Sequence, residues 1–213
     1  MKKQFFYFVI CLILVNCKET QPELTLKYSN QPIAIACDTD HSELFNEAIH
    51  SFESDITKFY TQENPNLNYA YNMFLKESTS NTANYNTISN EHALAIFEAL
   101  KNIEGLWVTK NNQTLPNYNH KIYSCIGDHI QDKDLKTTYN ALLTTNSMSI
   151  RMLKDVLIAK SSRLNSDKYL ATFVALELYY SKLTDVDLSK KELLPADTTR
   201  KKDNDPHAGH NHD

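Results

Sequence analysis

Glycine is scarce in this chain, with only three among 213 residues. A fold rich in tight turns needs glycine wherever the backbone takes a positive φ, and a phosphate-binding loop needs several glycines close together. This scarcity disfavours an all-β fold and a glycine-rich loop, so helices are the better expectation. The net charge is also slightly negative, at −4. An acidic chain gains nothing from the counterion release that drives nucleic-acid binding, so we expect no nucleic-acid partner.

Catalytic signatures are missing as well. The sequence has no nucleophile elbow, no zinc-protease histidine pair, no thioredoxin-type cysteine pair and no phosphate loop. Active sites are often assembled from residues far apart in the chain, so these absences lower the expectation of an enzyme without excluding one.

The first residues have the layout of a signal peptide. Two lysines precede an apolar run over residues 5–15, which Asn16 and the polar residues after Cys17 end. A permanent transmembrane helix needs about 20 apolar residues, so this run is too short to span a bilayer. We predict that residues 1–16 are a signal peptide that is removed on export.

The end of this run, Leu14-Val15-Asn16-Cys17, resembles the lipobox of bacterial lipoprotein precursors. Asn16 departs from the family pattern, which has Gly, Ala or Ser before the cysteine. The resemblance implies cleavage before Cys17 and fatty acyl chains, such as palmitate, that hold the protein to a membrane of the cell envelope. Lys18, where the family uses Asp for inner-membrane retention, implies the outer membrane, at its periplasmic face or the cell surface. The alternative is an ordinary secretory signal.

Export leaves two cysteines for the mature domain. Cys11 lies in the signal peptide and Cys17 carries the lipid, so Cys37 and Cys125 remain. An oxidising compartment favours pairing of two such thiols, and a disulfide closing so long a loop would contribute roughly 4.5 kcal/mol. Two separately buried thiols are the alternative.

The spacing of apolar residues predicts one all-α domain over residues 38–183, a bundle of about six or seven helices. The expected helices cover residues 40–60, 64–75, 90–103, 122–130, 135–143, 148–164 and 167–183. Residues 105–119 show no period and are predicted to form a long loop. Residues 17–37 are polar and typical of a tether, and residues 184–213 are typical of a disordered tail.

One motif in the first helix could bind metal. Glu47 and His50 form a Glu-x-x-His, which di-iron bundles use twice. The motif occurs once here, and a helical wheel places both residues and Glu43 opposite the apolar stripe. We therefore predict a solvent-exposed helix face.

Three further side chains are candidates for a site. His129 falls on the apolar face of its helix, where a buried histidine with one hydrogen bond is expected more than a ligand or general base. Trp107 and Tyr118 could stack on a sugar or peptide, although packing that fixes residues 105–119 to the domain is the commoner use of a tryptophan.

The last seven residues contain His207, His210 and His212, three of the eight histidines. Imidazole binds Zn²⁺, Cu²⁺ and Ni²⁺, and a flexible segment can bring three such groups around one ion. Asp205 and Asp213 could add a carboxylate. A solvated tail without a metal role is the alternative.

Together these features predict a membrane-anchored envelope lipoprotein that acts as a non-enzymatic binding module, with divalent metal or an envelope protein as its partner. Two alternatives stay open. One is an envelope hydrolase with a site near residues 105–119 and His129, and the other is an inhibitor or immunity-type lipoprotein.

Overall fold

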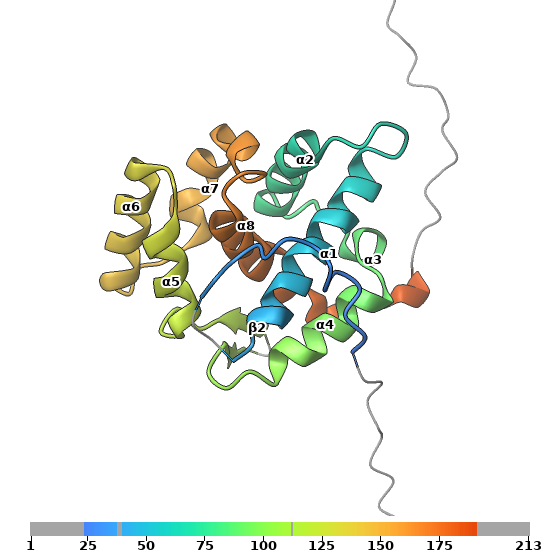
Figure 1. Ribbon diagram of the computed structural model, residues 1–213, viewed down its shortest axis with the longest axis horizontal. Helices are drawn as coiled ribbons and strands as arrows, with labels where there is room; N and C mark the ends of the chain where they lie inside the picture. The colour runs from blue at the N-terminus through green and yellow to red at the C-terminus, as the bar shows by residue number, and fades with distance from the viewer. Residues whose placement is uncertain (1–23, 38–39, 112, 191–213) are drawn as a thin grey trace, which may run out of the picture.

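The fold is a single mostly helical domain, as the sequence predicts, with one small sheet added. The computed structural model describes residues 24–37, 40–111 and 113–190 (Figure 1). The α-helices in this part of the chain are α1 Ser42–Tyr60, α2 Leu67–Thr79, α3 Tyr85–Ile88, α4 Glu91–Lys101, α5 Lys121–His129, α6 Lys133–Thr144, α7 Ile150–Ala159 and α8 Lys168–Val174. None of these helices combines the length and apolar character needed to cross a membrane.

The helix α1 lies at the centre of the domain (Figure 1). Its stripe of Phe45, Ile49, Phe52 and Ile56 is fully buried, as its 3.6-residue spacing predicts. The ring of Phe52 lies 5.0 to 5.9 Å, between ring centroids, from three aromatic rings, two on α2 and one on the helical turn that follows α8. The core therefore forms around one long amphipathic helix.

The C-terminal helical run is not uniform. After α8 the chain continues without a break as a π-helical turn, Ala175–Tyr179, and a 3-10 segment, Tyr180–Asp185. The Ser161–Arg163 and Leu188–Lys190 segments are also 3-10 helices. Residues 184–190, predicted to be part of a disordered tail, thus have local structure, whereas the remainder of that tail lies outside the described residues.

Several helices begin at a residue whose side chain caps the first turn. The side chains of Asn66, Asp132, Ser149 and Asp167 each accept a hydrogen bond from a first-turn backbone N–H, which stabilises the start of α2, α6, α7 and α8. The helix α1 instead follows His41, which makes no side-chain cap.

The region predicted as a long loop contains a β-hairpin. Strands β1 Trp107–Lys110 and β2 Gln113–Pro116 pair antiparallel, with Trp107 opposite Pro116. Asn111 takes the left-handed conformation at φ 52°, which asparagine tolerates. Strands of four residues are too short to show an alternating period, so the sequence did not reveal them. The indole Nε1 of Trp107 donates to the carbonyl of Leu100, which fixes the hairpin to α4.

The predicted tether is shorter than the sequence suggests. Residues 24–37, here called the strap, cross the front of α1 and end beside α5 (Figure 1). Ile35 is 1% exposed and belongs to the core. The polar composition of the strap gave no indication that it packs on the domain, because its backbone makes most of the hydrogen bonds that hold it. Residues 1–16 and the lipidation candidate Cys17 lie outside the described residues.

Candidate functional site

The strap is bound to α1 through its main chain, first at Glu47. The two carboxylate oxygens of Glu47 each accept one hydrogen bond, at 2.8 Å, from the backbone N–H groups of Lys27 and Tyr28. Glu47 lies on the second turn of α1 and is only 2% exposed. A carboxylate that accepts two backbone N–H groups fixes the position of the chain that carries them.

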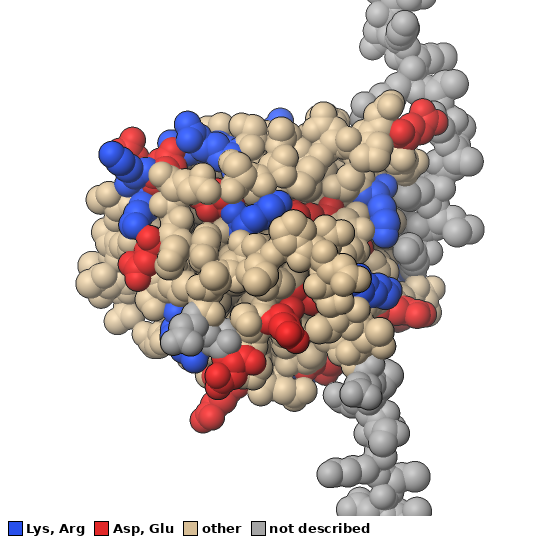
Figure 2. Space-filling view, in the orientation of Figure 1, with Lys and Arg blue, Asp and Glu red and all other residues tan. Residues whose placement is uncertain are grey.

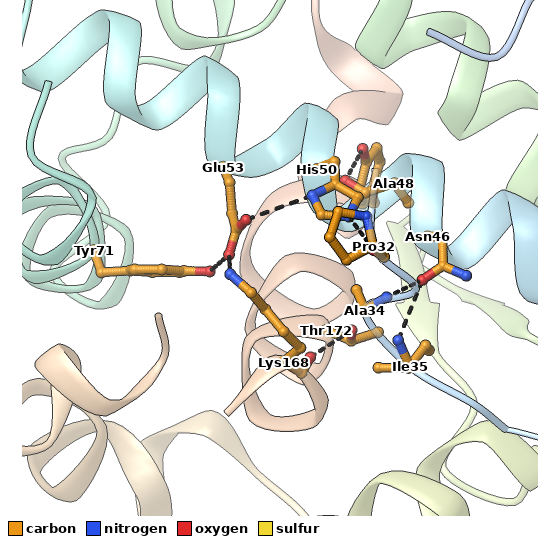
Figure 3. Close-up of polar contacts among 11 residues, drawn as sticks. Pro32, Ala34, Ile35, Asn46, Ala48, His50, Glu53, Tyr71, Lys168 and Thr172 are labelled. Carbon is orange, nitrogen blue, oxygen red and sulfur yellow. Dashed lines mark hydrogen bonds and ion pairs between the residues drawn. The ribbon is translucent and has the colours of Figure 1, made fainter. Parts of the chain in front are cut away.

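A second set of bonds holds the middle of the strap (Figure 3). Asn46 points its amide oxygen at the strap and accepts hydrogen bonds from the N–H of Ala34 at 2.6 Å and of Ile35 at 3.2 Å. His50 contacts the carbonyl of Pro32 through Nε2 at 3.0 Å. Three residues on one side of α1 thus hold the strap through its backbone.

A disulfide fixes the end of the strap. Cys37 and Cys125 on α5 are bonded, with an S–S length of 2.01 Å and their Cα atoms 5.9 Å apart. The predicted pairing is therefore confirmed. The bond joins residues that are 88 positions apart and clamps the strap against the face of the domain.

His129 does not lie where the sequence predicts. It is exposed, stacks on Tyr169 at 4.5 Å between ring centroids, and contacts the carbonyl of Cys125 through Nδ1 at 2.8 Å. The prediction of a buried histidine was wrong, because His129 is the last residue of α5 and the helix end reaches the surface. Its ring faces Tyr169, whereas the hairpin lies beyond the opposite end of α5, so the structure does not bring it together with residues 105–119.

The prediction of an exposed Glu47 was also wrong. The helical wheel correctly placed Glu47 away from the phenylalanine stripe, but the strap and α4 cover that second face. Its side-chain partner is His92 of α4, whose Nε2 lies 2.6 Å from the Glu47 carboxylate, with the two side chains 8% and 1% exposed. His50 of the Glu-x-x-His motif instead contacts Pro32 and approaches Glu53 at 3.9 Å.

Two further carboxylates of α1 are buried and paired. Glu53 accepts from the hydroxyl of Tyr71 at 2.6 Å and pairs with the ammonium of Lys168 (Figure 3). Asp55 accepts from the hydroxyl of Tyr179 at 2.8 Å and from the amide of Asn90. Burying an ionised group is costly unless it is hydrogen-bonded, which explains why each has partners. The burial of these two carboxylates could not be predicted from the sequence, because charged residues on a helix usually face solvent.

An open groove of about 550 Å³ lies between the strap and the start of α1. Its strap wall is largely apolar and its α1 wall is polar; the lining residues are Leu26, Tyr28, Ser29, Gln31, Ile33, Ile35, Ala36, Cys37, Ser42, Glu43, Asn46 and Glu47. Ile33 is 75% exposed at the rim. This volume falls in the range of about 300–1,000 Å³ that small-molecule sites occupy.

A second pocket, also of about 550 Å³, lies on the other side of Tyr28. It is more polar, and besides Tyr28 it is lined by Lys27, Ser51, Asp55, Lys58, Asn90, Glu91, His92 and Leu188. The buried Glu47–His92 pair separates the two hollows. Neither the groove nor the second pocket could be predicted from the sequence, because both form only when the strap packs on the domain.

The hairpin covers a buried carboxyl group. Tyr118, predicted as a stacking residue, instead donates from its hydroxyl to Glu177 at 2.7 Å. Burial raises the pKa of Glu177 above its usual value, although the hydrogen bond from Tyr118 opposes that rise. Among the residues that the structure describes, the buried hydroxyl of Tyr123 has no hydrogen-bond partner. Tyr123 therefore belongs to the core, and Tyr118 is partly buried and packs against it.

Metal ligands do not converge within residues 24–37, 40–111 and 113–190, where no three His, Cys, Asp or Glu side chains are placed to hold an ion. The predicted ligands His207, His210 and His212 lie outside the described residues.

No protein-family model matches this chain, and no curated protein or solved structure shows significant similarity to it. Its function therefore has to be inferred from its own geometry.

Proposed function

We propose that this protein is a lipid-anchored, non-enzymatic binding module of the bacterial cell envelope, and that the groove between the strap and α1 holds its ligand. The observation that carries this proposal is the groove itself. One wall offers Leu26, Ile33 and Ile35, and the other offers oxygen acceptors on α1. Figure 2 shows this face, with both charge signs scattered over it and acidic groups in its lower half.

The two walls indicate the chemistry of the ligand. Full burial of an apolar side chain such as Ile33 by a ligand would contribute about 1.5–3 kcal/mol to the free energy of binding, so the ligand needs an apolar part. Glu43 at the rim is exposed and makes no ion pair in the part of the chain that the structure describes. The groove therefore suits a small amphipathic molecule with an apolar body and a cationic or hydrogen-bond-donating head.

The use of the polar groups favours binding over catalysis. The side-chain oxygens of Glu47 and Asn46 already accept hydrogen bonds from the strap backbone. These side chains therefore shape the groove and are not available in it as general bases. A preformed site of this kind binds without first ordering the chain, which reduces the entropic cost of association.

Two probes of similar length and opposite charge test the groove. We expect octyltrimethylammonium, below its micelle concentration, to bind more tightly than octanoate, with NMR shift changes confined to the strap and the first turns of α1. Ile33→Asn should weaken binding about tenfold, which corresponds to about 1.4 kcal/mol. Met152→Asn is the matched control, because Met152 is 65% exposed on α7, outside the groove.

Each of the following results would contradict the proposed groove site. Shift changes spread over the surface, or an equal loss of binding in Ile33→Asn and Met152→Asn, would show only nonspecific detergent contact. Tighter binding of octanoate would refute the assigned charge of the head group.

The anchor is proposed from the signal peptide and from Cys17. The Cys37–Cys125 disulfide supports export, because such bonds persist in oxidising compartments and are rare in the cytosol. Mass spectrometry of the mature protein should show an N-terminal acylated Cys17; an unmodified N-terminus would refute the anchor. Co-purification from membranes would identify an envelope protein partner, if the ligand is part of one.

The histidine tail is proposed to capture Zn²⁺, Cu²⁺ or Ni²⁺ beside the membrane. Calorimetry with Zn²⁺ should show a clear loss of binding when residues 207–213 are deleted. Binding should also fall below a pH of about 6.5, where imidazole protonates. Unchanged binding in the deletion variant would exclude the tail as the metal site.

A further inference from the structure

A separate pocket of about 330 Å³ lies between the end of α2, the start of α7 and the 3-10 segment Tyr180–Asp185. Its lining residues are Ser78, Thr79, Asn81, Ile150, Arg151, Lys154, Leu178 and Lys182. None of them lines the groove beside the strap. The two sites therefore use different parts of the surface.

Positively charged side chains line this pocket, although the protein as a whole is acidic. Arg151, Lys154 and Lys182 line it, and no Asp or Glu does, although the chain carries a net charge of −4. None of the three makes an ion pair within the described ranges, whereas Lys101, Lys160, Lys168 and Lys190 all do. Three like charges facing one hollow repel each other, and an anion that enters would relieve this repulsion. Lys182 also attracts the carboxylate of Glu177.

Neutral donors add to these cations. Ile150 and Arg151 lie in the first turn of α7, a ten-residue helix whose N-terminal end carries partial positive charge, although the backbone N–H of Arg151 already donates to the side chain of Ser149. Asn81, at the end of α2, takes a left-handed conformation at φ 58°, and its side-chain amide has no partner in the described part of the chain. The pocket thus presents guanidinium, ammonium and amide donors from three elements.

We infer that this pocket binds the phosphate group of a larger ligand. Arginine holds phosphate oxygens through two parallel hydrogen bonds, and lysines add point charge. A volume of about 330 Å³ exceeds a bare phosphate ion, which leaves room for the group attached to it. The same chemistry fits a soluble phosphate ester and the phosphodiester head group of a lipid.

The first experiment compares anions on the full chain. Inorganic phosphate should raise the thermal midpoint more than NaCl of equal ionic strength. The double variant Arg151→Gln/Lys154→Gln should lose that increment and bind phosphate at least tenfold more weakly by calorimetry. Lys110→Gln is the control, because Lys110 is exposed on β1 and also makes no ion pair in the described residues.

A second measurement separates binding from folding. In phosphate-free buffer of low ionic strength, the double variant should be at least as stable as the wild type, because mutual repulsion has been reduced. Lower stability would mean that the cations serve the fold and would overturn the inference. The same conclusion follows if phosphate acts no more strongly than NaCl, or if Lys110→Gln loses as much affinity.

Vesicles then distinguish the two sources of phosphate. Binding to phosphatidylglycerol vesicles but not to phosphatidylcholine vesicles, lost in the double variant, identifies an anionic lipid head group. Binding to inorganic phosphate with no response to either vesicle identifies a soluble ester. Vesicle binding that the double variant retains, without any response to phosphate, contradicts a phosphate site at this pocket.

Discussion

The carboxylate of Glu47 on α1 lies 2.6 Å from Nε2 of His92 on α4, and the same carboxylate accepts the backbone N–H groups of Lys27 and Tyr28. One side chain of α1 therefore joins that helix to residues 19 and 20 positions before it and to a residue 45 positions after it. This connection closes one end of the groove and separates it from the polar pocket beyond Tyr28.

Removing the Glu47 carboxylate should release the strap. Glu47→Ala leaves the backbone donors at residues 27 and 28 and the ring of His92 without their acceptor, so we expect a loss of about 3–5 kcal/mol in the free energy of unfolding. Urea denaturation measures that loss, and hydrogen exchange should accelerate at those two amides. Glu43→Ala, one turn earlier and exposed, should change stability by less than about 0.5 kcal/mol. Equal effects of the two substitutions would contradict this role.

Breaking the disulfide should destabilise the whole domain. In the chain-entropy model a bond across 88 residues restricts the unfolded chain, so Cys37→Ser/Cys125→Ser should lose about 2–5 kcal/mol. Urea unfolding with and without a reductant measures this. The reductant should destabilise the wild type and leave the double variant unchanged; a response of both proteins would point to another target.

The buried Glu177 should make stability depend on pH. Because burial raises its folded pKa above the usual value of about 4.5, its contribution is fully present below pH 4.5 and is lost as pH rises through the folded pKa. Glu177→Gln keeps an acceptor for Tyr118 and removes the charge. Its stability relative to the wild type should therefore increase as the pH rises from 4 to 7, as measured by urea unfolding at each pH. Glu104→Gln, which is exposed, is the control. A pH-independent difference for Glu177→Gln would refute the prediction.

Gly127 should not tolerate a side chain. A Cβ there would lie 2.1 Å from Oδ1 of Asn140 and 3.0 Å from the ring of Tyr139, where α5 and α6 meet. Gly127→Ala should thus cost about 1–3 kcal/mol by overpacking, although alanine usually stabilises a helix relative to glycine. Asn140→Ala in the Gly127→Ala background should recover part of the loss measured by thermal unfolding. If Gly127→Ala alone stabilised the protein, the close approach of the helices would be disproved.

Apolar spacing was sufficient to predict the longer helices, whereas the four-residue helix α3 was not expected. The stripe of α1 could be read because a side chain's direction within a helix follows from its position in the sequence. Each hairpin strand has only four residues, which is too few to show an alternating pattern of apolar and polar side chains. The Cys37–Cys125 pair could be predicted because an exported protein acylated at Cys17 would have only these two thiols left to join.

The helical class, the long amphipathic helix α1 and the cysteines available for pairing could all be inferred from the amino-acid sequence, because they depend on local periodicity and on counting. The environment of the polar residues depends instead on which segments meet in the folded chain. A helical wheel shows that Glu47 lies opposite the phenylalanines, but it cannot show that residues 24–37 return to cover it. The groove and the cationic pocket arise in the same way, since each is formed by segments that meet only after the chain has folded.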